Sequence, residues 1–228
     1  MSPACELRRH GDPGSLVVAL ADELAARLAA AVAARGEASL VVPGGRTPQP
    51  VFERLRHAAL DWSRVTVTLT DERWVDAADA ASNEGLVRRA LLQGPAAAAR
   101  FVPLRNAAAT AGEGAAAATR ALQAITRPFD VVLLGMGDDG HTASLFPLSP
   151  GIEAALDPAA VPGCVAMTAP VAPLSRLSLN LAALAQARQH IVLFTGEPKW
   201  QVWQAADGLP IGLTLRQAAA RPLLYWSP

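Results

Sequence analysis

"DVVLLGMGDDGHTASLFP", residues 130–147, carries the strongest structural signal in the sequence. The run "VVLL" is solidly apolar, which is typical of a strand buried on both faces of a parallel sheet. Three glycines, two adjacent aspartates and one histidine follow within a few residues. A flexible, titratable segment directly after a buried strand indicates either a tight turn or a catalytic loop.

Similar apolar runs recur along the chain and alternate with Ala- and Leu-rich helical segments. The expected strands are "ASLVV", "VTVTL", "FVPL", "CVAMTA", "LSLNL", "HIVLF" and "PLLYW". Helices are expected over residues 15–35, 49–57, 83–92, 115–125, 181–188 and 200–206, the first with Ser15 as N-cap and Gly36 as its stop. This alternation predicts an α/β fold with a mostly parallel sheet and helices on both faces. Because "VTVTL" alternates, we expect it at an edge or against a wetter surface, and the lack of a linker predicts one domain over residues 1–228.

Composition narrows the classes of function. The chain has 228 residues, is 51% hydrophobic, and balances 20 basic against 20 acidic residues. A neutral balance gives no electrostatic footprint for nucleic acid or for an anionic membrane, so we expect neither partner. Cys5 and Cys164 lie far apart and in no metal-ligand pattern, which predicts a reducing compartment and no metal site. With no signal peptide or membrane-length apolar run recognised, we expect a soluble cytoplasmic protein.

Ligands of open parallel sheets bind at the carboxyl ends of the strands, so we expect binding residues directly after the strands. In "VVPGGRTPQPVF", residues 41–52, Gly44 and Gly45 permit a tight turn before a helix start. With Arg46 and Thr47 beside them, free backbone N–H groups there would form a phosphate cradle. The alternative is a plain strand-to-helix turn, and the stretch is not a Walker A loop because no Gly-Lys-Ser/Thr follows.

Two further strand ends carry charges. In "VTVTLTDERWV", residues 65–75, Asp71, Glu72 and Arg73 are either solvated loop residues or groups that contact a substrate. In "FTGEPKW", Lys199 falls in the first turn of a helix, where its charge opposes the helix dipole. An anionic ligand would remove that conflict, whereas an exposed, tolerated lysine is the simpler alternative.

The opening stretch offers the best catalytic candidate. His141 is one of four histidines, and of these His10, His57 and His190 fit structural or exposed roles. His141 differs because a neighbouring carboxylate such as Asp139 can orient its ring. The ordinary histidine pKa of about 6.5 suits a general base at neutral pH. We expect residues 142–144 to begin a helix.

These blocks, taken in order, resemble the 6-phosphogluconolactonase family. The blocks are "VVPGGRTP", "TLTDERWV", "SNEGLVRRALL", "DVVLLGMGDDGHTASLFP" and "FTGEPKW", which together reach from about residue 38 to about residue 203. The resemblance implies a modified doubly wound α/β fold and hydrolysis of 6-phospho-D-glucono-1,5-lactone by a monomer that needs no cofactor. It assigns His141 as the base, gives Asp139 a role in positioning the site or orienting the histidine, and places Asp71 and Arg73 in the active site. The residues implied in substrate and phosphate binding are Gly44, Gly45, Arg46, Thr47, Lys199 and Arg176, the last within "PLSRLSLN".

Two alternatives compete with a lactonase. The related glucosamine-6-phosphate deaminases carry an acidic residue directly before the proline that closes the histidine block. Here that residue is Phe146, before Pro147, so their acid–base chemistry would lack its carboxylate. A non-catalytic sugar-phosphate sensor would keep the phosphate loop but lose the base, which His141 retains. The sequence leaves open which basic residue meets the phosphate, and whether Asp139 or Asp71 lies beside His141.

Overall fold

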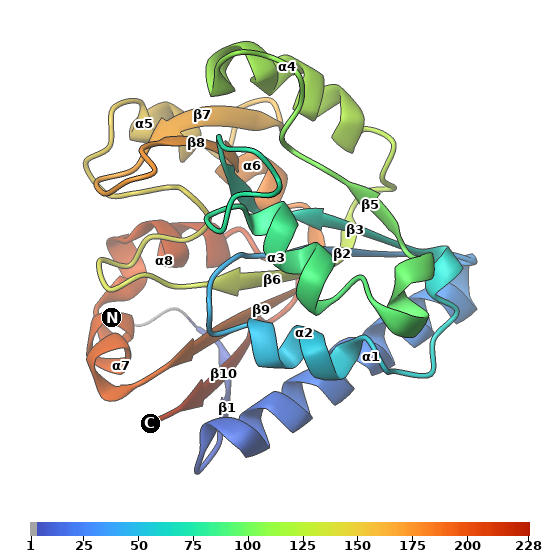
Figure 1. Cartoon of the computed structure of the whole chain (residues 1–228). Helices are drawn as coiled ribbons and strands as arrows, with labels where there is room; N and C mark the ends of the chain where they lie inside the picture. The colour runs from blue at the N-terminus through green and yellow to red at the C-terminus, as the bar shows by residue number, and fades with distance from the viewer. Residues whose placement is uncertain (1–3) are drawn as a thin grey trace.

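The computed structural model describes residues 4–228 and centres on a seven-stranded sheet (Figure 1). The strand order is β1-β10-β9-β6-β2-β3-β5, and every pair in it is parallel. The strands are β1 (Glu6–Arg9), β2 (Ala38–Val42), β3 (Val65–Leu69), β5 (Arg100–Val102), β6 (Phe129–Gly135), β9 (Ala187–Thr195) and β10 (Leu223–Ser227). All five residues of β2 are buried, as expected for a strand covered on both faces.

A second sheet of three antiparallel strands has the order β4-β8-β7. Its strands are β4 (Asp71–Arg73), β7 (Cys164–Thr168) and β8 (Ser175–Leu179). Helix α4 (Ala111–Leu122) packs against β7 and β8, at the top of the view in Figure 1.

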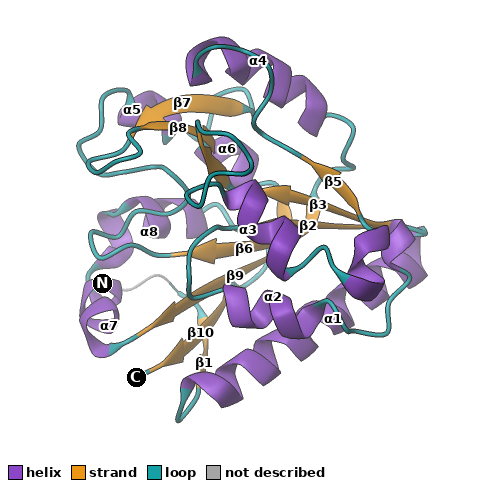
Figure 2. Cartoon of the chain, in the orientation of Figure 1, coloured by secondary structure: helices purple, strands orange, loops and turns teal. Residues whose placement is uncertain are grey.

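The remaining helices lie around the two sheets (Figure 2). They are α1 (Pro13–Arg35), α2 (Gln49–Leu55), α3 (Asn83–Ala90), α5 (Ile152–Ala155), α6 (Leu181–Leu184), α7 (Glu197–Gln204) and α8 (Pro210–Leu215). Short 3₁₀ turns span Trp62–Arg64, Gly94–Ala98 and Ala206–Gly208. Helix α1 crosses β2, β6 and β10 and buries a leucine stripe at helical spacing. Within residues 4–228, no helix combines the length and the apolar character needed to cross a membrane.

The order of the strands places a topological switch between β2 and β6. From β2 the chain winds outward through β3 to β5, whereas β6 leads to β9 and β10 on the other side. This confirms the predicted mostly parallel, doubly wound α/β fold. In such sheets a crevice for ligands opens at the carboxyl ends of the two strands that flank the switch.

Several local expectations were wrong. "CVAMTA" and "LSLNL" do form strands, but in the small antiparallel sheet. "VTVTL" is not at an edge, because β3 pairs with both β2 and β5, and buried Thr68 donates its hydroxyl to the carbonyl of Val102. The helix expected over residues 181–188 ends at Leu184, since β9 begins at Ala187. Gly36 does end α1 in a left-handed conformation, whereas the N-cap is Asp12, whose carboxylate accepts the N–H of Ser15.

Candidate functional site

A polar pocket of about 620 Å³ lies at the carboxyl ends of β2 and β6, where the strand order predicts a crevice. Segments from both sheets and from α3 and α7 contribute to its walls. Of the ten predicted site residues, nine line it, namely Gly44, Gly45, Arg46, Thr47, Asp71, Arg73, His141, Arg176 and Lys199. The tenth, Asp139, is not among the lining residues but contacts His141, which is.

His141 and Asp139 form a tight pair in the loop after β6. Asp139 Oδ1 lies 2.5 Å from His141 Nδ1 and also accepts the backbone N–H of His141 at 3.0 Å. Burial tends to raise the pKa of Asp139, but the hydrogen bonds and charge of His141 outweigh it and hold that pKa below its ordinary value. Within residues 4–228, His141 Nε2 has no hydrogen-bond partner. The aspartate beside the histidine is therefore Asp139, which answers the question that the sequence left open.

The backbone of this loop is shaped around the histidine ring. Gly137 donates its N–H to the carbonyl of His141 at 2.9 Å. A Cβ on Gly137 would lie 2.1 Å from the imidazole, so only glycine leaves room for this ring position. The helix expected over residues 142–144 does not form, because Ala143 adopts a left-handed conformation with φ of 51° and Thr142 bridges to Leu145.

The same turn directs the side chain of Ser144 toward Asp71. The Ser144 hydroxyl donates to Asp71 Oδ2 at 2.6 Å, and Thr70 donates to Oδ1 at 3.0 Å. Asp71 is buried, with only 6% of its surface exposed, and these two hydroxyl groups satisfy its carboxylate. Asp71 is thus connected to the histidine loop through Ser144 rather than through His141 itself.

Arg73 and Arg176 lie side by side on one face of the small sheet. They are directly paired in the antiparallel register of β4 and β8, so both side chains lie on the same face. Burial lowers the pKa of Arg176, and the neighbouring Arg73 lowers it further, although nearby acids oppose this. Arg176 Nε donates to the carbonyl of Pro173 at 2.9 Å, whereas the buried Nε of Arg73 has no partner. Two like charges in direct register form a wall of the pocket that attracts anions.

Lys199 approaches the pocket from α7. Its Nζ donates to the carbonyl of Met136 at 2.7 Å and lies 3.8 Å from the carboxylate of Asp138. The lysine therefore bends back to the end of β6 instead of extending into solvent. It is also the only lysine among the 20 basic residues of the chain, a signal that sequence reasoning missed.

Sequence reasoning also missed Asn83 and Ser144, both of which line the pocket. Asn83 opens α3 and donates from Nδ2 to the carbonyl of Asp71 at 2.8 Å. Its position within the "SNEG" block was the available signal. Among residues 4–228, no group of three His, Cys, Asp or Glu side chains is placed to hold a metal ion.

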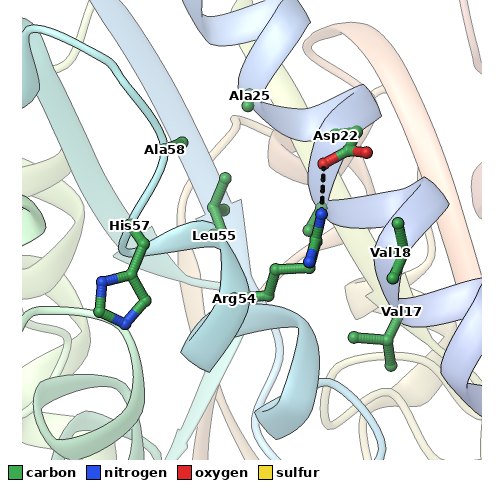
Figure 3. A pocket seen from close by; sticks show the side chains of 9 residues that line it. Val17, Val18, Asp22, Ala25, Arg54, Leu55, His57 and Ala58 are labelled. Atoms are coloured by element: carbon green, nitrogen blue, oxygen red, sulfur yellow. Dashed lines mark hydrogen bonds and ion pairs between the residues drawn. The ribbon is translucent and has the colours of Figure 1, made fainter.

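A different hollow, of about 540 Å³, lies between α1 and α2 (Figure 3). Its walls are mostly aliphatic, with Val17, Val18 and Leu55 among them. Arg54 extends toward Asp22 across it, with 3.4 Å between guanidinium and carboxylate. This groove belongs to the helix layer and contains none of the predicted site residues, so the pocket at the strand ends is the candidate active site.

A doubly wound sheet with a polar pocket at its switch point is the arrangement of α/β enzymes that bind small ligands. The family model described as glucosamine-6-phosphate isomerases/6-phosphogluconolactonase matches residues 11–219, and the chain belongs to this family.

Individual relatives agree with that assignment. A 6-phosphogluconolactonase of Pseudomonas aeruginosa is 50% identical over 92% of this chain and 89% of its own length. A 6-phosphogluconolactonase of Rhizobium meliloti is 46% identical over 95% of this chain and 96% of its own. The crystal structure of a 6-phosphogluconolactonase from Shewanella baltica has a TM-score of 0.91 and 42% identity, with 98% of each chain covered. The predicted family resemblance is confirmed.

Proposed function

We propose that this protein hydrolyses 6-phospho-D-glucono-1,5-lactone to 6-phospho-D-gluconate, with His141 as the general base. The observation that carries the proposal is the Asp139–His141 pair. His141 lines the pocket at the switch point of the sheet, and its Nε2 is free while Nδ1 contacts Asp139. A volume of about 620 Å³ lies within the usual range for small-molecule sites. The names of the relatives, at up to 50% identity, supply the substrate.

The proposed reaction begins with a water molecule beside His141. Because Asp139 accepts a hydrogen bond from Nδ1, Nε2 is the nitrogen left with a lone pair for a proton. Nε2 removes a proton from the water as its oxygen attacks the lactone carbonyl, which gives a tetrahedral oxyanion. When the carbonyl re-forms, the bond to the ring oxygen breaks, and protonated His141 returns its proton to that oxygen. A positioned base of this kind contributes about 10²–10⁴-fold to the rate.

Charges on the walls complete the proposed mechanism. Arg73 and the backbone N–H groups of the glycine loop are the candidate donors for the oxyanion. Lys199 and the loop of Gly44 to Thr47 hold the phosphate, and Arg176 assists substrate binding. Fixing the remote phosphate orients the carbonyl, so part of that binding energy lowers the barrier.

The contact between Phe146 and His141 argues against deaminase chemistry. The two rings lie 4.5 Å apart between centroids, so an apolar ring occupies the position where the deaminases carry their acid. His141 packs against the ring of Phe146, so position 146 supplies no carboxylate beside the base. The structure therefore favours lactone hydrolysis over ring-opening deamination.

The test is hydrolysis of freshly generated 6-phosphoglucono-δ-lactone, coupled to 6-phosphogluconate dehydrogenase. We expect the wild-type protein to accelerate hydrolysis and His141→Ala to lose about 10²-fold or more of kcat. His57→Ala is the matched control, because His57 lies beside the α1–α2 groove and away from the pocket. If wild type and His141→Ala both show the spontaneous rate while remaining folded, the proposal is wrong.

A further inference from the structure

Glu72 is a buried acidic residue that the proposed mechanism leaves without a role. It lies in the middle of β4, and side chains alternate along a strand, so it projects away from the face shared by Asp71 and Arg73. Only 1% of its surface is exposed. A carboxylate so deeply buried is costly unless hydrogen bonds satisfy it.

Four donors satisfy this carboxylate, and three of them come from the start of α3. Oε1 accepts the backbone N–H groups of Arg73 and Asn83, each at 2.7 Å. Oε2 accepts the N–H of Glu84 at 2.7 Å and the hydroxyl of Ser82 at 3.1 Å. Burial raises the pKa of Glu72, and these backbone donors oppose the rise. Glu72 thereby fixes the first turn of α3 to β4.

Asn83 transmits this attachment to the pocket. Its Nδ2 donates to the carbonyl of Asp71, and its side chain covers Gly44 so closely that a Cβ there would lie 1.8 Å from Oδ1. Asn83 and Gly44 both line the pocket. The start of α3 is therefore wedged between the strand that carries Asp71 and the loop of residues 43–48.

We infer that Glu72 is a positioning residue that sets the spacing between β4 and the loop of residues 43–48. It acts through Asn83 and does not itself line the pocket. If its attachment loosens, Asn83 withdraws from Gly44, and the groups proposed to hold the phosphate lose their fixed distance from Asp71 and Arg73. The kinetic consequence rests on the proposed function, whereas the structural consequence does not.

Asp130 provides a matched control at the opposite end of the sheet. It too is a largely buried carboxylate that accepts a backbone N–H, from Ser39 at 2.8 Å, and it pairs with Arg35 and Arg188. It sits at the start of β6, whereas the pocket lies at the carboxyl end of that strand. Removing its charge should destabilise the fold without changing the pocket.

The experiment compares Glu72→Gln with Asp130→Asn. In Glu72→Gln an amide group faces the N–H donors of α3, so two attachments are lost and KM for the lactone should rise about tenfold or more, with a smaller change in kcat. Asp130→Asn should lower the melting temperature but leave KM within about twofold of wild type. A KM for Glu72→Gln that matches that of Asp130→Asn would overturn the inference.

Hydrogen exchange provides a readout that needs no activity. Amides of residues 44–47 should exchange faster in Glu72→Gln than in wild type, and at the wild-type rate in Asp130→Asn. If Glu72→Gln does not fold, Asn83→Ala tests the same route, because it removes the wedge and leaves Glu72 in place. Unchanged exchange of the amides of residues 44–47 in the folded variant would overturn the inference even if wild type proved inactive on the lactone. Absence of wild-type hydrolysis would instead count against the proposed function alone.

Discussion

Lys199 donates a hydrogen bond to the carbonyl of Met136, and all the remaining Lys or Arg positions of the chain are arginine. A lysine presents a compact point charge on a narrow stem, whereas arginine carries a wide planar fork. The side chain is 29% exposed, so its amine is partly shielded by the pocket wall. This choice of residue fits the proposed contact between one small charge and a phosphate oxygen.

Loss of that amine should weaken binding more than chemistry. We expect Lys199→Ala to raise KM by about 10–100-fold, the loss typical of one hydrogen bond to a charged group, with kcat within about threefold. Lys199→Arg should also raise KM, because a wide planar fork places its charge differently from a compact ammonium group. Steady-state kinetics would measure both constants. Arg64→Ala is the control variant, because it removes an equal positive charge from an exposed position. A fall in kcat with unchanged KM would contradict this assignment.

At this scale the sequence predicted residues that share a loop better than residues that meet across the fold. Asp139 and His141 are two positions apart, so their contact follows from local geometry alone. The pairing of Arg73 with Arg176 depends on the register of β4 and β8, which the sequence does not encode locally. The approach of Ser144 to Asp71 depends on the left-handed turn at Ala143, and alanine gives no sign of that conformation.

Among the elements, β9 contains a fully buried histidine. His190 Nε2 contacts the carbonyl of Leu184 at 2.8 Å, while its Nδ1 is buried and has no partner. Burial lowers the pKa of His190, and the hydrogen bond to Leu184 offsets this only in part. The folded protein therefore holds this histidine neutral at pH values where the unfolded chain protonates it.

Stability should consequently fall in mild acid. In the unfolded chain the pKa is about 6.5 and the folded value is lower, so the unfolded state binds the extra proton as the pH drops below 6.5. The free energy of unfolding should then decrease by up to about 1.4 kcal/mol per pH unit through this group. Denaturant titrations from pH 7.5 to pH 5 would measure it, with His190→Gln as the comparison. Equal slopes for the two proteins in that range would refute the expectation.

The strands themselves were predictable from apolar runs, but their partners were not. "CVAMTA" and "LSLNL" read as further strands of the parallel sheet, yet only a short connection joins β7 to β8, and they form an antiparallel hairpin. The first strand, β1, was missed because its residues are mostly charged and exposed. An edge strand of this kind lacks the apolar signal of a buried one.

At the scale of the whole molecule, most buried apolar residues among residues 4–228 belong to one continuous cluster. It includes Leu40 and Val131 from the large sheet together with Met167 and Leu177 from the small one. The two sheets therefore share a core, and neither buries its inner face without the other. The expectation of one domain over residues 1–228 follows the same logic from the absence of a linker.

Unfolding should accordingly be a single cooperative transition. We expect one calorimetric peak whose van't Hoff enthalpy equals the calorimetric enthalpy. Leu177→Ala, in the small sheet, should lower the free energy of unfolding by the roughly 2–5 kcal/mol typical of a buried leucine. The peak should then move to a lower temperature without splitting. Two separate transitions, or a small sheet that melts first in Leu177→Ala, would show two independent units instead.

The solitary lysine also makes the pocket chemically addressable. A mild acylating reagent would find one side-chain amine in the whole chain, and that amine lines the pocket. The cysteines compete less, because burial raises the pKa of Cys5 to about 11 and that of Cys164 to about 12, which keeps both thiols protonated at neutral pH. A single mass increment on Lys199 would therefore report whether the pocket is empty or filled, without any need to follow turnover.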